Sequence, residues 1–352
     1  MRKLAPISML FLSSLLALLI TLLVSAGHAR ASASYHHSLS VYSTYPSNAL
    51  LRQCEALKKS KGLEKKNSEQ CVEDAIPVEH FLVALKNSNA FARLMPFEDG
   101  GDYELLIANM GHTDGQYAEF ILQWRGLEIS SLQFSYTNQQ VSTNQAASVL
   151  VDMWLEKVRK DNVFSNVFLF SALQASNYTQ ELFVPDKIGD FTKLETQLYD
   201  DPFNGAITRY THSQFEDALI DVTVYPFMEA LSVEDGELLY AQLREDVARA
   251  EKTAQSQALT LSQPSPASPY AASSDVVGWR VGLKAESETA PTLYASTYVF
   301  RRGDKIVKVS TTFPVQFSDP IADELIASIS VPTESVLMKN IRQLLQQSAQ
   351  GD

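Results

Sequence analysis

The stretch GAITRYTHSQFEDALIDVTVYPF, residues 205–227, predicts the centre of the carboxy-terminal half of the chain. Apolar and polar residues alternate on both sides of a polar turn, which is the pattern of two half-buried β-strands joined as a hairpin. The first strand has two faces, one with Ile207, Arg209 and Thr211 and the other with Ala206, Thr208 and Tyr210. In the second strand one face carries the apolar residues Ala218, Ile220, Val222 and Val224. At least one apolar face of the hairpin must therefore be covered.

The order of elements around the hairpin predicts an α+β domain over residues 185–331. Strands are expected at residues 191–199, 206–210, 218–226, 277–285, 292–301 and 305–313, and helices at 233–257 and 319–330. This order predicts a six-stranded antiparallel sheet covered by helices. Residues 253–275 contain three prolines among Ser, Ala and Gln, and predict a disordered loop. Residues 333–352 predict a terminal helix and tail.

A second α+β domain is predicted over residues 48–182. Helices are expected at residues 48–60, 68–75, 77–92 and 145–160, and strands at 102–110, 117–126 and 131–136. The result is a helix, three-strand, helix layer. Residues 32–47 lack a clear period and predict a poorly ordered lead-in, and residues 164–182 predict a helix at the junction.

The carboxy-terminal order of elements resembles the PsbP-like fold. The segments Ile188-Gly189-Asp190-Phe191, Val222-Thr223-Val224-Tyr225-Pro226 and Ile306-Val307-Lys308-Val309 are similar to segments of bacterial exported proteins of unassigned function. The resemblance covers residues 185–331 and contains no catalytic signature. It implies a domain that binds or scaffolds.

A second resemblance covers residues 77–160. There the helix from Phe81 to Phe91 leads through Ala92-Arg93-Leu94 into Asp102-Tyr103-Glu104-Leu105. This pattern resembles the small α+β domains of envelope proteins such as the TolB amino-terminal domain and transporter-auxiliary lipoproteins. It implies contact with other envelope components, although the chain lacks the lipid-attachment cysteine of the lipoprotein members.

The amino terminus has the layout of a signal peptide. Arg2 and Lys3 precede an apolar run over residues 4–24, and small residues with A-x-A-like cleavage sites follow. Cleavage after Ala31 would remove residues 1–31 and leave a periplasmic or secreted protein. The apolar run is also long enough to span a bilayer, so an inner-membrane protein anchored by residues 4–24 is the alternative.

The charge of the chain limits its partners. The formal net charge is -12, and cleavage after Ala31 removes three basic residues and no acidic one, which gives -15. An acidic protein is repelled by nucleic acids and by anionic membranes, so no nucleic-acid partner is predicted. Membrane contact is expected only through an uncleaved amino terminus.

Two cysteines, Cys54 and Cys71, are present in a chain predicted to be exported. An oxidising compartment favours a disulfide between them. A redox or metal pair would need a closer C-x-x-C spacing or further ligands, and this spacing has neither.

A basic run coincides with the predicted disulfide loop. Its six basic residues outnumber Glu55 and Glu64 and give a local charge of +4: Arg52, Lys58, Lys59, Lys61, Lys65 and Lys66. One interpretation is a solvated face around the loop. The other is a binding site for an envelope protein or an acidic surface component.

Candidate catalytic residues are few, and each has an ordinary explanation. Asp200-Asp201-Pro202 is typical of a turn. His212, Ser213 and Asp217 share one turn, where they cannot converge as a triad. Asp99, Asp102 and Asp114 lie on neighbouring turns without an EF-hand pattern, and the adjacent His36 and His37 lack a third ligand. The sequence thus predicts a noncatalytic protein without metal or cofactor; the alternative is a periplasmic hydrolase using carboxylates near Asp200.

Overall fold

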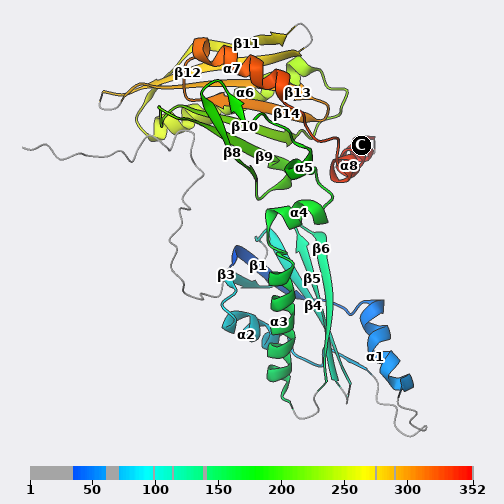
Figure 1. Cartoon of the computed structure of the whole chain (residues 1–352). Coiled ribbons are helices and arrows are strands. Elements are labelled where there is room, and N and C mark those ends of the chain that lie inside the picture. The colour runs from blue at the N-terminus through cyan, green and yellow to red at the C-terminus, as the bar shows by residue number, and fades with distance from the viewer. Residues whose placement is uncertain are drawn as a thin grey trace, which may run out of the picture. The chain divides into compact units, whose positions relative to one another are not determined.

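The computed structural model describes residues 35–60, 71–97, 100–112, 115–137, 141–273, 276–288 and 291–350. The described part of the chain divides into two compact units, with the division between Leu173 and Gln174. Each unit contains one β-sheet and several helices, so the protein is α+β (Figure 1). The predicted signal peptide at 1–31 and the alternative anchor at 4–24 lie outside the described residues. None of the described helices is long and apolar enough to cross a membrane.

The amino-terminal unit contains a six-stranded mixed sheet. Its order is β3-β1-β4-β5-β6, with β2 paired to β4, and β1 runs parallel to both of its neighbours. The strands are β1 (Tyr35–Ser43), β2 (Val72–Glu73), β3 (Phe91–Pro96), β4 (Tyr103–His112), β5 (Gly115–Trp124) and β6 (Leu127–Tyr136).

Helices cover both faces of this sheet. On one face, α2 (Val78–Asn87) and α3 (Thr143–Lys160) bring Phe81 and Trp154 against Phe120 of β5. On the other face, α1 (Asn48–Ser60) packs Leu50 against β4 and β5. A short helix, α4 (Asn166–Ala172), ends the unit. Serines start α3 and α4: the Ser142 side chain accepts from the backbone N–H of Gln145, and Ser165 from that of Phe168.

The predicted lead-in at residues 32–47 is wrong, because β1 lies inside the sheet. Leu39 and Val41 are fully buried between β3 and β4. Only Ser38, Ser40 and Tyr42 alternate with these two apolar residues, so the period of two is short and gives a weak strand signal. Pairing with distant strands, which the local sequence does not report, makes this segment a strand.

Two predicted helices of this unit also need correction. In the described part of residues 68–75 the chain forms the strand β2. The helix predicted over 77–92 ends at Asn87, and Phe91 begins β3. Asn89 has a φ of 50°, the left-handed conformation that commonly ends a helix.

The carboxy-terminal unit contains an eight-stranded antiparallel sheet in the order β11-β12-β13-β14-β10-β9-β8-β7. All six predicted strands are present, and two edge strands add to them. The strands are β7 (Lys187–Ile188), β8 (Phe191–Leu198), β9 (Ala206–His212), β10 (Leu219–Pro226), β11 (Thr260–Ser273), β12 (Val276–Glu286), β13 (Leu293–Arg302) and β14 (Lys305–Thr311). The helices are α5 (Tyr178–Glu181), the 3-10 turn η1 (Pro202–Asn204), α6 (Asp235–Ser256), α7 (Val315–Ser328) and α8 (Val336–Gln350).

The predicted hairpin at residues 205–227 is confirmed as β9 and β10. Tyr210 pairs with Ile220 and Thr208 with Val222, and all four side chains are buried. β10 continues into the sheet through β14, where Val222 pairs with Val309. The hairpin is therefore central to the sheet.

The predicted disordered loop at 253–275 is wrong. Helix α6 continues to Ser256, and residues 260–273 form the edge strand β11. Pro264, Pro266 and Pro269 are compatible with this position because an edge strand needs only part of its N–H groups for pairing. Register shifts after Ser262 and Ser265 accommodate them.

Helix α7 crosses the face of the sheet opposite α6 and contacts both edge strands, β11 and β7. Its polar side chains are bonded to the sheet beneath. Asp319 accepts hydrogen bonds from the Tyr298 hydroxyl (2.6 Å) and from Arg280 (2.5 Å), and Asp323 accepts one from Tyr270 (2.7 Å). Burial raises the pKa of the Tyr298 hydroxyl well above its usual range, so this group remains a donor. We call these three contacts the α7 clamp.

We expect Asp319→Ala to destabilise the protein by about 2 to 3 kcal/mol, since two donors, one of them charged, lose their acceptor. Urea denaturation of the full chain measures this change. Glu324→Ala is the matched control, because Glu324 is an exposed acid on the same helix. Equal stabilities of the two variants would contradict a role for the α7 clamp.

Candidate functional surfaces

The predicted disulfide between Cys54 and Cys71 is present. It joins the middle of α1 to Cys71, the residue before β2, and Cys54 is fully buried against Ala108, Met110 and Tyr117. Arg52, the first residue of the basic run, is exposed on α1. Both ends of the disulfide loop are therefore attached to the sheet of the amino-terminal unit.

The rest of the predicted basic run lies outside the described residues. This holds for the side chains of Lys58 and Lys59 and for the whole of Lys61, Lys65 and Lys66. Binding by these residues stays a prediction.

The carboxylates predicted for the hydrolase alternative are far from the candidate base. Asp201 precedes η1, where its side chain accepts a hydrogen bond from the Phe203 N–H (2.9 Å), and Asp200 is exposed beside it. His212 is at the other end of β9. Six residue steps at ~3.3 Å separate the ends of that strand by roughly 20 Å. These three groups do not form one site.

His212 has a structural contact on its own turn. Its Nδ1 accepts hydrogen bonds from the backbone N–H groups of Gln214 (3.0 Å) and Phe215 (3.3 Å). Ser213 and Asp217 are exposed on the same turn. His212 thus fixes the turn and does not face a nucleophile there.

The predicted cation candidates are separated as well. Asp102 forms an ion pair with Arg125 (2.8 Å), while Asp99 and Asp114 lie outside the described residues. His36 and His37 are successive residues of a strand, so they face opposite ways. Within the described ranges, no three His, Cys, Asp or Glu residues come together as a metal site.

A buried ionic cluster, which the sequence analysis did not predict, attaches α8 to the sheet. Asp304 and Lys305 form a pair at 2.6 Å, and both are almost completely buried. Arg342 of α8 pairs with Glu334, lies 3.7 Å from Asp304, and donates to the Phe227 carbonyl (2.7 Å). Burial lowers the pKa of the Lys305 ammonium, and the Asp304 carboxylate opposes that shift. Two acids and two bases balance each other here, which fits a structural role.

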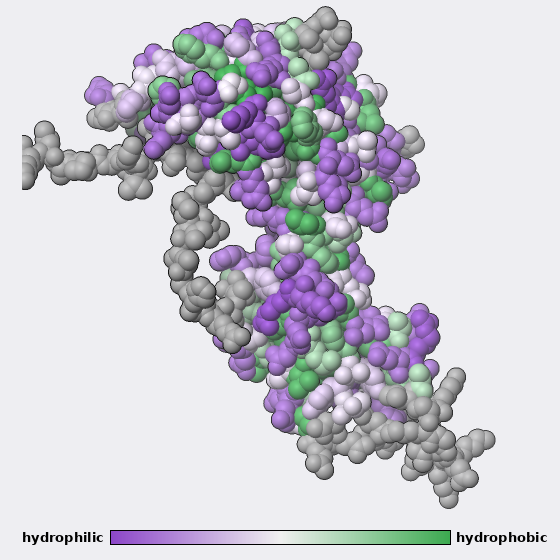
Figure 2. Space-filling view, in the orientation of Figure 1, coloured by the Kyte–Doolittle hydropathy of each residue, from purple (hydrophilic) through white to green (hydrophobic). Residues whose placement is uncertain are grey.

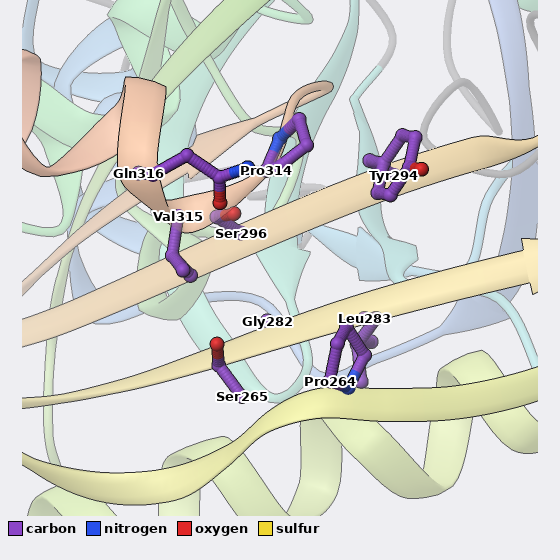
Figure 3. A pocket seen from close by; sticks show the side chains of 9 residues that line it. All are labelled: Pro264, Ser265, Gly282, Leu283, Tyr294, Ser296, Pro314, Val315 and Gln316. Carbon is purple, nitrogen blue, oxygen red and sulfur yellow. The ribbon is translucent and has the colours of Figure 1, made fainter.

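A small cavity lies beneath the first turn of α7 (Figure 3). Its volume is about 110 Å³, and its walls come from β11, β12, β13, Pro314 and the first two residues of α7. Gly282 leaves the space open: a Cβ added there would lie 2.8 Å from Val315 Cγ1 and 3.0 Å from Ser265 Cβ. The buried Ser296 hydroxyl is already bonded to the Phe313 carbonyl (2.7 Å). The cavity is therefore predominantly apolar.

A chain of aromatic rings runs from this cavity to the β9–β10 turn. Phe313, next to Pro314 at the cavity, stacks on Phe191 at 5.7 Å. Phe191 contacts His212 at 5.0 Å, and His212 contacts Phe215 at 4.9 Å. Phe215 is 61% exposed, and Phe317 in the first turn of α7 is 65% exposed.

We call this region the corner surface: the cavity, Tyr294 at its rim, Phe317 and Phe215. On the face of the molecule shown in Figure 2, hydrophilic residues predominate and hydrophobic ones reach the surface in separate small patches. The sequence analysis did not predict the corner surface. Its one sequence signal is Phe313-Pro314-Val315-Gln316-Phe317, apolar residues at a helix start where polar ones are usual.

Comparison with known proteins identifies no family for this chain. No family model matches it, and no curated protein matches it. Among solved structures, cyanobacterial PsbP (CyanoP) from Synechocystis is similar to 43% of this chain over 92% of its own length, with 9% identity and a TM-score of 0.29. A protein from Bacteroides thetaiotaomicron has 11% identity and a TM-score of 0.26 over 45% of this chain; this chain spans about half of that protein (48%). Similarity of this extent establishes no function.

We expect the double variant Cys54→Ser, Cys71→Ser to lower the stability of the amino-terminal unit by about 3 kcal/mol, since a disulfide across 17 residues restricts the unfolded chain. Thermal unfolding should show an earlier transition for this unit and an unchanged one for the carboxy-terminal unit. Reduction of the wild type should have the same effect. Two free thiols in the oxidised protein would contradict the disulfide.

We expect Arg342→Ala to cost about 3 to 5 kcal/mol, because the Glu334 carboxylate loses its partner, the Phe227 carbonyl loses its donor and the buried cluster loses one of its two positive charges. Hydrogen exchange should rise first in α8, which Arg342 holds to the Phe227 carbonyl. Lys339→Ala, an exposed change on the same helix, is the control. Unchanged protection of α8 in Arg342→Ala would show that the ionic cluster does not hold this helix.

Proposed function

We propose that the protein is a noncatalytic protein of the cell envelope, periplasmic or secreted, that binds or scaffolds an acidic partner. The observation that carries this proposal is the disulfide between Cys54 and Cys71, which closes the loop that contains the basic lysines and packs against the sheet of the amino-terminal unit. A disulfide also fits an exported protein, because oxidising compartments preserve it. A basic segment within a disulfide loop, on a chain of net charge -12, favours contact with an acidic surface.

The fold proposal for the carboxy-terminal unit is PsbP-like. Its support is the order of elements, three strands (β8–β10), helix α6, further strands (β11–β14) and helix α7. Members of that fold mostly bind or scaffold, in agreement with the proposed function. The two additional edge strands, β7 and β11, are a departure from the six-stranded expectation.

Charge reversal tests the proposal. We expect Lys58→Glu, Lys59→Glu, Lys61→Glu to reduce recovery of the bound partner from envelope extract about tenfold at low salt. Raising the salt concentration should weaken wild-type recovery in the same way, because exposed charges are screened beyond about 8 to 10 Å at physiological ionic strength. The matched control reverses Lys86, Lys252 and Lys339, which are exposed elsewhere and change the net charge equally.

Two results would contradict the proposed function. The first is unchanged recovery of the same partner by the triple variant while its fold is intact. The second is turnover of ester, peptide, glycoside or phosphate substrates that is lost in Asp201→Asn or His212→Gln, which would favour the hydrolase alternative.

A further inference from the structure

The cavity at the corner surface has the size of one side chain. A water molecule needs ~10–15 Å³ of such space, and pockets for small organic ligands usually measure about 300–1,000 Å³. The cavity, at about 110 Å³, is larger than the space that one water molecule needs and much smaller than a pocket for a small organic ligand. Its apolar walls favour an aliphatic or aromatic side chain over a polar group. A side chain that enters this cavity belongs to a polypeptide, so the rest of that polypeptide must lie on the surface beside the cavity.

The backbone is held at both exposed aromatic residues of the corner surface. Phe215 is fixed by the hydrogen bond from its own N–H to His212 and by the contact between the two rings. Phe317 lies in the first turn of α7, which the α7 clamp holds to the sheet. Segments whose backbone is ordered before binding lose little conformational entropy when a partner covers them. These two rings are therefore suited to contact a partner.

Acidic side chains lie at the β9–β10 turn that carries Phe215. Asp190 is 88% exposed, and its carboxylate lies 4.0 Å from Nε2 of His212. Glu216 and Asp217 follow Phe215 on the same turn, are exposed, and form no ion pair with any described residue. Three acids at one corner favour a basic partner and repel an acidic one.

We propose that the corner surface binds a polypeptide segment in which one apolar side chain is flanked by Lys or Arg residues. The apolar side chain enters the cavity, the neighbouring backbone crosses Phe317 and Phe215, and the basic residues face Asp190, Glu216 and Asp217. The path crosses β13, β14, β10 and β9, three strand spacings of ~4.8 Å or roughly 14 Å, which four or five extended residues span. This surface is separate from the basic run, which would bind an acidic partner.

Selection from a random 12-residue display library on the wild-type protein tests the proposal. We expect enriched sequences to share one Leu, Ile, Phe or Pro with at least two nearby Lys or Arg residues. The consensus peptide, labelled with fluorescein, then serves as the probe in anisotropy titrations at two salt concentrations. Its affinity should fall as salt rises.

Variants assign the probe to the corner surface. Phe317→Ser and Phe215→Ser should each weaken binding about tenfold or more, as for buried aromatic contacts in interfaces. Ser265→Leu, which fills the cavity, and Tyr294→Ser, which opens its rim, should do the same, so that one misfolded variant does not decide the result. Phe183→Ser is the matched control, since Phe183 is exposed to 59% away from this surface.

Charge variants separate the basic residues of the probe from its apolar one. Glu216→Lys with Asp217→Lys should weaken binding about tenfold at low salt and reduce its salt dependence, whereas Glu245→Lys with Glu251→Lys should leave it unchanged. Reversal of Lys58, Lys59 and Lys61 should also leave it unchanged, which distinguishes this site from the proposed function.

Four results would overturn the proposal. They are the absence of enrichment over an unrelated acidic protein, an enriched motif without basic residues, and a consensus peptide insensitive to the Phe317, Phe215, Ser265 and Tyr294 variants. The fourth is a different occupant: a dimer in sedimentation velocity that Phe317→Ser abolishes, or binding to neutral phosphatidylcholine vesicles that depends on the same residue.

Discussion

Helix α7 lies against the carboxy-terminal sheet and contacts both of its edge strands. The sheet covers the polar side chains on the inner side of α7, so these side chains need hydrogen-bond partners within the protein. The buried Ser318 hydroxyl lies 2.7 Å from the Thr311 hydroxyl. The Asp319 and Asp323 carboxylates accept hydrogen bonds from the hydroxyls of Tyr298 and Tyr270, respectively. At the other end of the helix, Arg302 donates to the Ile326 carbonyl (3.0 Å). Each bond fixes the helix along its axis. The position of its first turn, and with it the cavity and Phe317, depends on this set of bonds.

The local sequence pattern was sufficient to predict the strands and helices in which apolar residues alternate strongly or repeat with a helical period. The hairpin of β9 and β10 and the long helix α3 were predictable because each has a continuous apolar face. β1 and β11 were not. Leu39 and Val41 give β1 only two strongly apolar positions, and the prolines of β11 suppress the strand signal. Their partners are far away in sequence, and only the folded sheet supplies them.

The candidate functional surfaces also include one feature that the sequence predicts and one that it does not. The disulfide was predictable from two cysteines in a chain with a predicted signal peptide, because disulfide formation depends on the compartment and on the number of cysteines. The corner surface was not predictable. Gly282 and Val315, which shape the cavity, come from separate elements, and Phe191 and Phe313 meet only when β8 and α7 occupy the same end of the sheet. His212 was considered for catalysis, but its neighbours show that it orders a turn.

The proline content of β11 has a consequence beyond the fold of one molecule. An open eight-stranded sheet has two edges, and an unpaired edge can recruit a strand from another molecule and start aggregation. Pro264, Pro266 and Pro269 remove N–H donors from one edge. The opposite edge, β7, is only two residues long, and nearby Phe183 pairs with Ser330. Both edges of the sheet are thereby protected against edge-to-edge association when many copies fold together.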